Sequence, residues 1–221
     1  MSESGAAEKP LIDVNAEIEA KYVVPNAGIF ERLLSLEKIG EYSLKEPATK
    51  TIADHYLDSA SGSIRRGGFA CRLRYNISRD AWVGTLKGLG NADGAVHTRT
   101  EHEVPIPPNA PPDQWPPSPA RDLALSLLHS QPIRELFVIH QTRHVRFICL
   151  RDLRVAELSL DQVLFEIGER RTKSLELEIE LVETGTLDDL HALGEALAEY
   201  RLQPEPRSKF ERGVALSETG H

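Results

Sequence analysis

The chain has 221 residues, of which 40% are hydrophobic and 27% charged, so it can form one domain or two small ones with a substantial core. Its formal net charge of −8 argues against general nucleic-acid binding, which needs a basic surface. No apolar run approaches the ~20 residues of a membrane-spanning helix, so no membrane partner is expected.

Residues 1–10 are small and polar and contain no apolar stretch typical of a secretory signal, so we predict a disordered N-terminal tail. Cys71 and Cys149 both lie in apolar, strand-like segments, and free buried thiols fit a reducing compartment. We therefore expect a cytoplasmic protein in which residues 11–221 form a single domain.

The first predicted strand, residues 14–24, contains an unusual charged face. Because side chains alternate along a strand, Glu17, Glu19 and Lys21 point to the same side, away from their apolar neighbours. Two carboxylates with an ammonium are poor core material, but they suit a divalent metal ion beside an anionic substrate. Taken alone, the motif is equally compatible with an exposed strand.

The remaining elements follow from periodicity and turn signals. Amphipathic spacing predicts helices, and one-sided alternation predicts strands. The predicted helices are residues 27–39 (with Asn26 as N-cap), 121–129 and 187–202, and the segment 41–48 is expected to be irregular. The predicted strands are residues 50–57, 70–77, 81–87, 96–104, one bent or two short strands in 135–150, and then 154–160, 163–168 and 174–182.

Residues 105–119 contain eight prolines, which predicts a loop or insertion rather than a packed element. The charged-strand pattern resumes after this loop. We therefore assign both sides of it to the same sheet and do not place a domain boundary there.

Nearly every predicted strand is apolar on one face and rich in arginine, lysine or glutamate on the other. An ordinary half-buried sheet shows solvent a more mixed polar face. This pattern favours an α+β, mostly β fold: an eight-stranded antiparallel closed barrel, a tunnel with a charged lumen, whose apolar outside is covered by a few helices.

Such a lumen would contain both signs of charge. Arginine and lysine suit phosphate oxygens, whereas carboxylates repel a polyphosphate unless a hard divalent cation lies between them. Together they indicate a linear polyphosphate complexed to Mg²⁺ or Mn²⁺. The cations expected in the lumen are Lys21, Arg72, Arg74, Lys87, Arg99, Arg143 and Lys209, and the acids are Glu17, Glu19, Glu101, Glu103, Glu157, Asp161, Glu176, Glu178 and Glu180.

An ordered set of motifs over residues 14–213 resembles the CYTH, or triphosphate tunnel metalloenzyme, superfamily. The motifs are Glu17-x-Glu19-x-Lys21, Tyr56-Leu57-Asp58, Arg72-Leu73-Arg74, Thr85-Leu86-Lys87, Arg99-Thr100-Glu101-His102-Glu103, Arg143, Glu157 with Asp161, Glu178-Ile179-Glu180 and Ser208-Lys209. The resemblance implies an eight-stranded tunnel that hydrolyses or cyclises triphosphates with Mg²⁺ or Mn²⁺. Within the superfamily the chain looks most like bacterial inorganic triphosphatases.

The resemblance also implies a role for each matching residue. Metal binding falls to Glu17, Glu19, Glu178 and Glu180. Binding of a second metal ion or orientation of the attacking water falls to Glu101, Glu103, Glu157 and Asp161. Substrate binding falls by the resemblance to Lys21, Arg72, Arg74, Lys87 and Arg143, and we add Arg99, Arg146 and Lys209 as further expected substrate ligands.

Two features depart from the family pattern. Gln141 stands where some members have a lysine proposed as a base, so a lysine base is not expected here. Glu176 precedes Glu178 and Glu180 at the same spacing, which leaves the register of the metal-binding pair open by two residues.

The expected partner is a small triphosphate, and a homodimer is possible by resemblance only. The leading function is metal-dependent hydrolysis of inorganic triphosphate to pyrophosphate and phosphate. The alternatives are a class IV adenylate cyclase, a thiamine triphosphatase, or a non-catalytic module that binds polyphosphate or nucleotides. Zinc bound by the scattered histidines is disfavoured, because His97 and His102 would lie on opposite faces of one strand.

Overall fold

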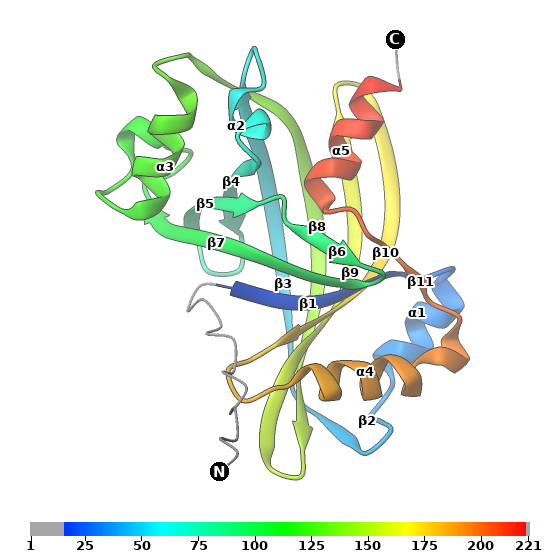
Figure 1. Cartoon of the computed structure of the whole chain (residues 1–221). Helices are drawn as coiled ribbons and strands as arrows, with labels where there is room; N and C mark the ends of the chain where they lie inside the picture. The colour runs from blue at the N-terminus through cyan, green and yellow to red at the C-terminus, as the bar shows by residue number, and fades with distance from the viewer. Residues whose placement is uncertain (1–15, 220–221) are drawn as a thin grey trace, which may run out of the picture.

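Eight antiparallel strands close into a barrel (Figure 1). The structure, a computed structural model, describes residues 16–219, although the side chains of residues 16 and 91–93 are not described. The barrel runs β1-β10-β9-β8-β3-β4-β5-β7, and β7 pairs back with β1 to complete the circle. This confirms the predicted fold class. The barrel strands are β1 Ala16–Val23, β3 Tyr42–Ser59, β4 Phe69–Asn76, β5 Ala81–Gly88, β7 Val96–Ile106, β8 Ile133–Leu150, β9 Leu153–Ile167 and β10 Arg170–Leu181.

Helices cover the outside of the barrel in two places. The outer faces of β1, β9 and β10 pack through Ala20, Leu158 and Leu177 against α1 (Ala27–Leu34) and α4 (Leu187–Ala196). On the other side, β4, β5 and β7 pack against α2 (Ser63–Arg66) and α3 (Pro119–Leu128). Figure 1 shows these two groups of helices on different sides of the barrel. Burial of apolar strand faces beneath helices leaves the charged faces directed inward.

One end of the interior is apolar. The rings of Tyr56, Phe137 and Phe210 pack together there at tilted angles, with ring centroids 5.0 Å apart for Tyr56–Phe137 and 5.6 Å for Tyr56–Phe210. Phe210 belongs to α5 (Lys209–Glu218), which packs beside β9. At Gly213 a β-carbon would lie 2.3 Å from the Phe137 ring, so glycine is required for this close approach. The interior is therefore closed by an apolar cluster at the α5 end and charged elsewhere.

Three short strands and two 3-10 turns complete the fold. The strands are β2 Lys38–Ile39, β6 Asn91–Asp93 and β11 Gln203–Pro204, and the turns are η1 Pro112–Gln114 and η2 Ala198–Tyr200. The proline-rich segment packs against the barrel through Ala110 and Trp115, which are both buried. The strands on either side of it, β7 and β8, belong to one sheet.

Several predicted boundaries differ from the structure. The first helix keeps its Asn26 cap but ends at Leu34, before β2. Residues 42–59 form one strand, because a bulge between Lys45 and Ala48 accommodates Pro47. Residues 153–167 likewise form a single strand, and α5 was not predicted, although Ser208 and Glu211 form a capping box at its start.

The predicted tail, residues 1–10, lies outside the described residues. Among residues 16–219, no helix is long and apolar enough to cross a membrane.

Candidate active site

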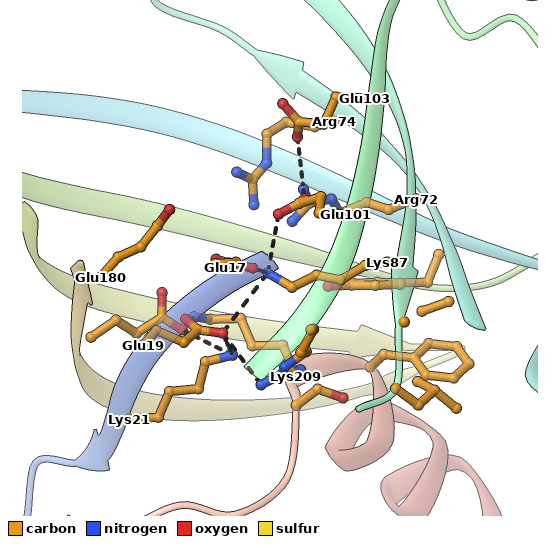
Figure 2. A pocket seen from close by; sticks show the side chains of 18 of the residues that line it. Glu17, Glu19, Lys21, Arg72, Arg74, Lys87, Glu101, Glu103, Glu180 and Lys209 are labelled. Atoms are coloured by element: carbon orange, nitrogen blue, oxygen red, sulfur yellow. Dashed lines mark hydrogen bonds and ion pairs between the residues drawn. The ribbon is translucent and has the colours of Figure 1, made fainter. Parts of the chain in front are cut away.

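The charged part of the interior forms a cavity of about 250 Å³ (Figure 2). Eight cationic side chains and seven carboxylates line it, together with Tyr56 and Phe210 at the α5 end. The cations are Lys21, Lys50, Arg72, Arg74, Lys87, Arg99, Arg143 and Lys209, and the carboxylates are Glu17, Glu19, Glu101, Glu103, Glu157, Glu178 and Glu180.

Carboxylates gather where β1 meets β10. Glu19 lies opposite Glu180 in the strand register, and Glu17 is the next residue of β1 on the same face. Burial and the negative charge of Glu19 raise the pKa of Glu17 to about 7. Burial and the charges of Glu17 and Glu19 raise the pKa of Glu180 to about 8, although part of this side chain reaches solvent, which screens the effect. In this part of the cavity the nearby cations do not fully neutralise the carboxylates, so Glu17 and Glu180 resist ionisation.

Lys87 is shared among several of these acids. Its Nζ forms an ion pair with Glu17 and lies 3.3 Å from Glu101 Oε2 and 3.9 Å from Glu19 Oε1. Burial alone would lower the pKa of Lys87, but the surrounding carboxylates raise it above its ordinary value. Glu19 also pairs with Lys21 and Arg99, and Glu101 with Arg72, whereas among residues 16–219 Glu17 pairs with Lys87 alone. Lys87 therefore stays charged while Glu17 is difficult to ionise.

A second ionic cluster lies nearer α5. Glu178 accepts a 2.6 Å hydrogen bond from Lys209 Nζ and another of 2.6 Å from Arg143 Nη2, and Lys21 Nζ lies 3.9 Å away. Burial would raise the pKa of Glu178, but Lys209 and Arg143 hold it well below its usual range. Glu178 is therefore neutralised by protein cations, unlike Glu17 and Glu180.

The geometry resolves the register of the three glutamates of β10. Glu178 and Glu180 line the cavity, whereas Glu176 lies behind it, with Oε2 3.1 Å from Lys209 Nζ and Oε1 2.6 Å from Arg212 Nη1.

Comparison with known proteins agrees with this geometry. The family model for the CYTH domain matches residues 15–214, almost the whole chain. The chain belongs to the CYTH domain family. A comparison with curated protein sequences finds no significant match.

Solved structures share the architecture of this CYTH domain. A candidate adenylyl cyclase from Hippeastrum, described as having a dominant triphosphatase activity, aligns over 92% of this chain and 96% of its own, with 22% identity and a TM-score of 0.60. A candidate adenylate cyclase from Bacillus halodurans aligns over 90% and 98%, with 18% identity and a TM-score of 0.57. The Mimivirus capping enzyme triphosphatase aligns over 85% and 90%, with 15% identity and a TM-score of 0.54. At these identities the likeness shows a shared fold.

Two of the predicted site residues do not face the cavity of the CYTH domain. Asp161 has no exposed surface, because Arg143 binds it through Nε (2.8 Å) and Nη2 (2.6 Å) and Lys209 through Nζ (3.1 Å). The prediction that Asp161 binds a second metal ion or orients the attacking water is therefore corrected. Asp161 binds Arg143 and Lys209 beneath the cavity surface and holds these two cations in place. Arg146 points to the opposite side of β8 from Arg143 and donates to the carbonyls of Leu34 and Leu36 at the end of α1, so it is not a substrate ligand.

Sequence reasoning also missed cavity residues. Lys50 lines the cavity from β3, and alternation with Asp54 and Tyr56 on the same face would have found it. Ser208 and Phe210 reach the cavity from the start of α5, which the charged-strand pattern cannot reveal.

The donor set of this CYTH domain fits a hard divalent cation. Glu17 Oε2 and Glu19 Oε1 are buried without a hydrogen-bond donor, although each forms an ion pair with a lysine. Among residues 16–219, no three side chains of the metal-binding types converge into a complete cage. Mg²⁺ usually uses one or two carboxylates together with water and substrate phosphates, so a partial carboxylate site is what it requires.

Proposed function

We propose that this CYTH domain hydrolyses inorganic triphosphate to pyrophosphate and phosphate with the help of Mg²⁺ or Mn²⁺. The observation that carries this proposal is the division of one cavity into a cation-rich wall and a cluster of under-neutralised carboxylates. A substrate that complements both the cation-rich wall and the carboxylate cluster must be strongly anionic and must bind as a complex with a divalent cation. The triphosphatase described for the Hippeastrum and Mimivirus relatives agrees with this choice.

Arginine and lysine side chains hold the phosphates in this proposal. Arg72, Arg74 and Arg143 offer planar forks that match phosphoryl oxygens, and Lys21 and Lys209 act as compact charges. All five line the same cavity, and they come from four elements (β1, β4, β8 and α5), so they surround a bound anion rather than contact it from one side. Positioning and charge stabilisation are the main contributions that a protein makes to phosphoryl transfer.

The candidate metal ligands in this proposal are Glu17, Glu19 and Glu180. Because no three carboxylates of the described residues converge, one or two of them would bind the ion directly, together with water and phosphate oxygens. Glu178 was predicted to share this role, but we leave it out because it accepts hydrogen bonds from both Lys209 and Arg143. Glu19 is also paired with Lys21 and Arg99, but its buried Oε1 accepts no hydrogen bond, so we keep it. A bound Mg²⁺ or Mn²⁺ supplies positive charge that stabilises the phosphoryl oxygens during transfer.

Glu157 is the carboxylate best placed to orient the attacking water. It lines the cavity, and among residues 16–219 it has no hydrogen-bonding or ion-pairing partner, so its oxygens can accept a proton from water. Water adds to a terminal phosphorus, the bridging P–O bond breaks, and pyrophosphate leaves with the bridging oxygen. Glu101 and Glu103 are less free, because Arg72 Nη2 lies 3.1 and 3.4 Å from them.

The size and chemistry of the cavity favour inorganic triphosphate over a nucleotide. Its volume of about 250 Å³ lies below the ~300–1,000 Å³ typical of pockets for drug-sized organic ligands. Its two aromatic lining residues, Tyr56 and Phe210, pack against each other in the apolar cluster, which disfavours stacking of an adenine ring between them.

A substrate panel tests the proposal. Initial rates are measured with Mg²⁺ and with Mn²⁺ on inorganic triphosphate, thiamine triphosphate and ATP at equal concentration. We expect inorganic triphosphate to have the highest kcat/KM and ATP to yield no cyclic product. Faster turnover of thiamine triphosphate would indicate a thiamine triphosphatase, and formation of cyclic AMP would indicate an adenylate cyclase. Binding of triphosphate without turnover would indicate a non-catalytic binding module.

A further inference from the structure

Asp54 lies directly behind the cations of the cavity. It sits on β3 opposite Arg74 of β4, has no exposed surface and does not line the cavity itself. Arg74 donates from Nε to Oδ1 (2.7 Å) and from Nη2 to Oδ2 (2.8 Å). Gln141 donates from Nε2 to Oδ2 (2.7 Å), and Arg72 Nη1 lies 3.8 Å from the same oxygen.

This geometry fixes which edge of the guanidinium faces the cavity. Asp54 occupies the Nε–Nη2 edge of Arg74, so the N–H groups of Nη1 and the remaining one of Nη2 stay available. Asp161 holds Arg143 in the same side-on manner, across β9 and β8. Two fully buried aspartates, Asp54 and Asp161, thus each hold one cavity arginine through a pair of hydrogen bonds on the side of the guanidinium away from the cavity.

The carboxylate of Asp54 is charged in this setting. Burial would raise its pKa, but Arg74 and Arg72 overcome this effect and hold the pKa well below its usual range. A buried charge persists only when partners satisfy it from several sides, as β4 and β8 do here.

We propose that Asp54 is a positioning residue that presets Arg74 and Arg72 for the anionic substrate. It does not touch the substrate, and it lowers the entropic cost of binding by holding the arginine forks in place before the anion arrives. The proposal rests on the proposed function only in taking a polyphosphate as the anion. It adds a residue that the sequence motifs did not assign to the site.

Whether Asp54→Asn weakens or strengthens triphosphate binding distinguishes a positioning role of Asp54 from a purely electrostatic effect of its charge. Asp54→Asn removes a negative charge close to the arginines, so electrostatics alone predicts tighter binding of an anion. Loss of positioning predicts weaker binding, because the Asn NH₂ group opposes the N–H donors of Arg74 and Gln141. We expect the dissociation constant for inorganic triphosphate to rise about tenfold, which corresponds to about 1.4 kcal/mol.

The experiment is calorimetric titration of inorganic triphosphate into metal-free protein, repeated as KM and kcat measurements with Mg²⁺. The variants are Asp54→Asn, Asp54→Asn/Gln141→Glu and Asp58→Asn. The double variant moves the carboxylate to position 141, next to the new Asn amide, and we expect it to restore affinity to within about threefold.

Asp58→Asn is the matched control. Asp58 is almost equally buried on the same strand, but it accepts hydrogen bonds from the backbone of Ser59, Ile64 and Arg65 and, among residues 16–219, forms no ion pair with an arginine side chain. We expect it to lower the melting temperature without changing triphosphate affinity. If Asp54→Asn does not fold, Gln141→Ala removes one donor from Asp54 and should weaken binding about threefold.

Unchanged or tighter binding by Asp54→Asn, or an equal loss in Asp58→Asn, would overturn the proposal. Because binding is measured without turnover, a wild-type protein that binds but does not hydrolyse triphosphate would contradict the proposed function while still testing Asp54.

Discussion

Glu19 on β1 lies directly opposite Glu180 on β10 in the closed barrel. Like charges directly opposite each other on neighbouring strands destabilise a sheet. Lys21 Nζ lies 2.8 Å from Glu19, whereas Glu180 has no cationic partner among residues 16–219. We interpret this pair as a site whose repulsion is relieved when a divalent cation binds.

Replacement of Glu180 by Gln tests that interpretation. Without metal and above pH 8, where Glu180 is ionised, we expect the free energy of unfolding to rise by about 0.5 kcal/mol, because one member of the repelling pair becomes neutral. The increase in melting temperature caused by Mn²⁺ should shrink strongly. Thermal unfolding with and without Mn²⁺ measures both effects, with Glu195→Gln on the exposed face of α4 as control. A destabilised metal-free variant, or an undiminished Mn²⁺ effect, would contradict this account.

The raised pKa values predict a pH dependence of metal binding. Glu17 and Glu180, with pKa values near 7 and 8, must lose protons before they can ligate, so Mn²⁺ affinity should rise as pH increases from 6 to 8. Each displaced proton contributes up to about tenfold per pH unit. Calorimetry in two buffers of different ionisation enthalpy measures proton release directly. An affinity that is flat or falls over this range would show that these groups are already ionised.

Metal-free stability should change in the opposite direction. In the unfolded chain these glutamates lose protons near their ordinary value of 4.5, whereas the folded protein retains them to higher pH. The unfolded state therefore binds fewer protons between about 4.5 and 8, and stability falls as pH rises through that window. Urea denaturation at pH 5, 6, 7 and 8 checks the trend, and saturating Mn²⁺ should flatten it. A metal-free stability that rises with pH would exclude the raised values.

Most of the architecture could be predicted from the sequence, because inward charge alternates with outward apolar residues in nearly every strand. The positions of Glu17, Glu19 and Lys21 in one cavity followed directly from the two-residue period. Strand lengths could not be predicted, because bulges such as the one around Pro47 let a strand continue past a residue that normally ends it.

The sequence also could not predict which charged side chains reach the cavity and which are covered by their neighbours. Asp161 and Glu157 lie on the same face of β9, four residues apart. Only Glu157 reaches the cavity, because Arg143 and Lys209 cover Asp161. Arg146 was predicted to bind substrate, but its odd spacing of three residues from Arg143 turns it to the outer face of β8. Side-chain partners, rather than strand periodicity, decide these cases.

Asp161 and Glu157 should accordingly respond differently to mutation. Asp161→Ala removes one of the two carboxylates that Arg143 and Lys209 share and leaves Glu178 as the other, so it should cost about 3 kcal/mol of stability. Glu157→Gln should change stability by less than about 0.5 kcal/mol, but should lower kcat about a hundredfold if it orients the attacking water. Denaturant unfolding and steady-state kinetics measure the two quantities. A stable Asp161→Ala protein, or full activity in Glu157→Gln, would reverse the assignment.

Arg143 and Arg146 form a matched pair on one strand. Arg143→Ala should raise KM for triphosphate at least tenfold, because it removes a fork from the cavity wall. Arg146→Ala should leave KM unchanged and lower stability by about 1–2 kcal/mol, because the carbonyls at the end of α1 lose a charged donor. Raised KM in Arg146→Ala would return that residue to the site.

Phosphorus NMR of the products tests the central claim most directly. Inorganic triphosphate is incubated with the protein and Mg²⁺ or Mn²⁺, and with EDTA in parallel. Hydrolysis in the proposed cavity predicts one phosphate and one pyrophosphate for each triphosphate consumed, with no conversion in EDTA and little in Glu19→Gln. Triphosphate that stays intact with both metals, or conversion at the same rate in EDTA, would contradict the account.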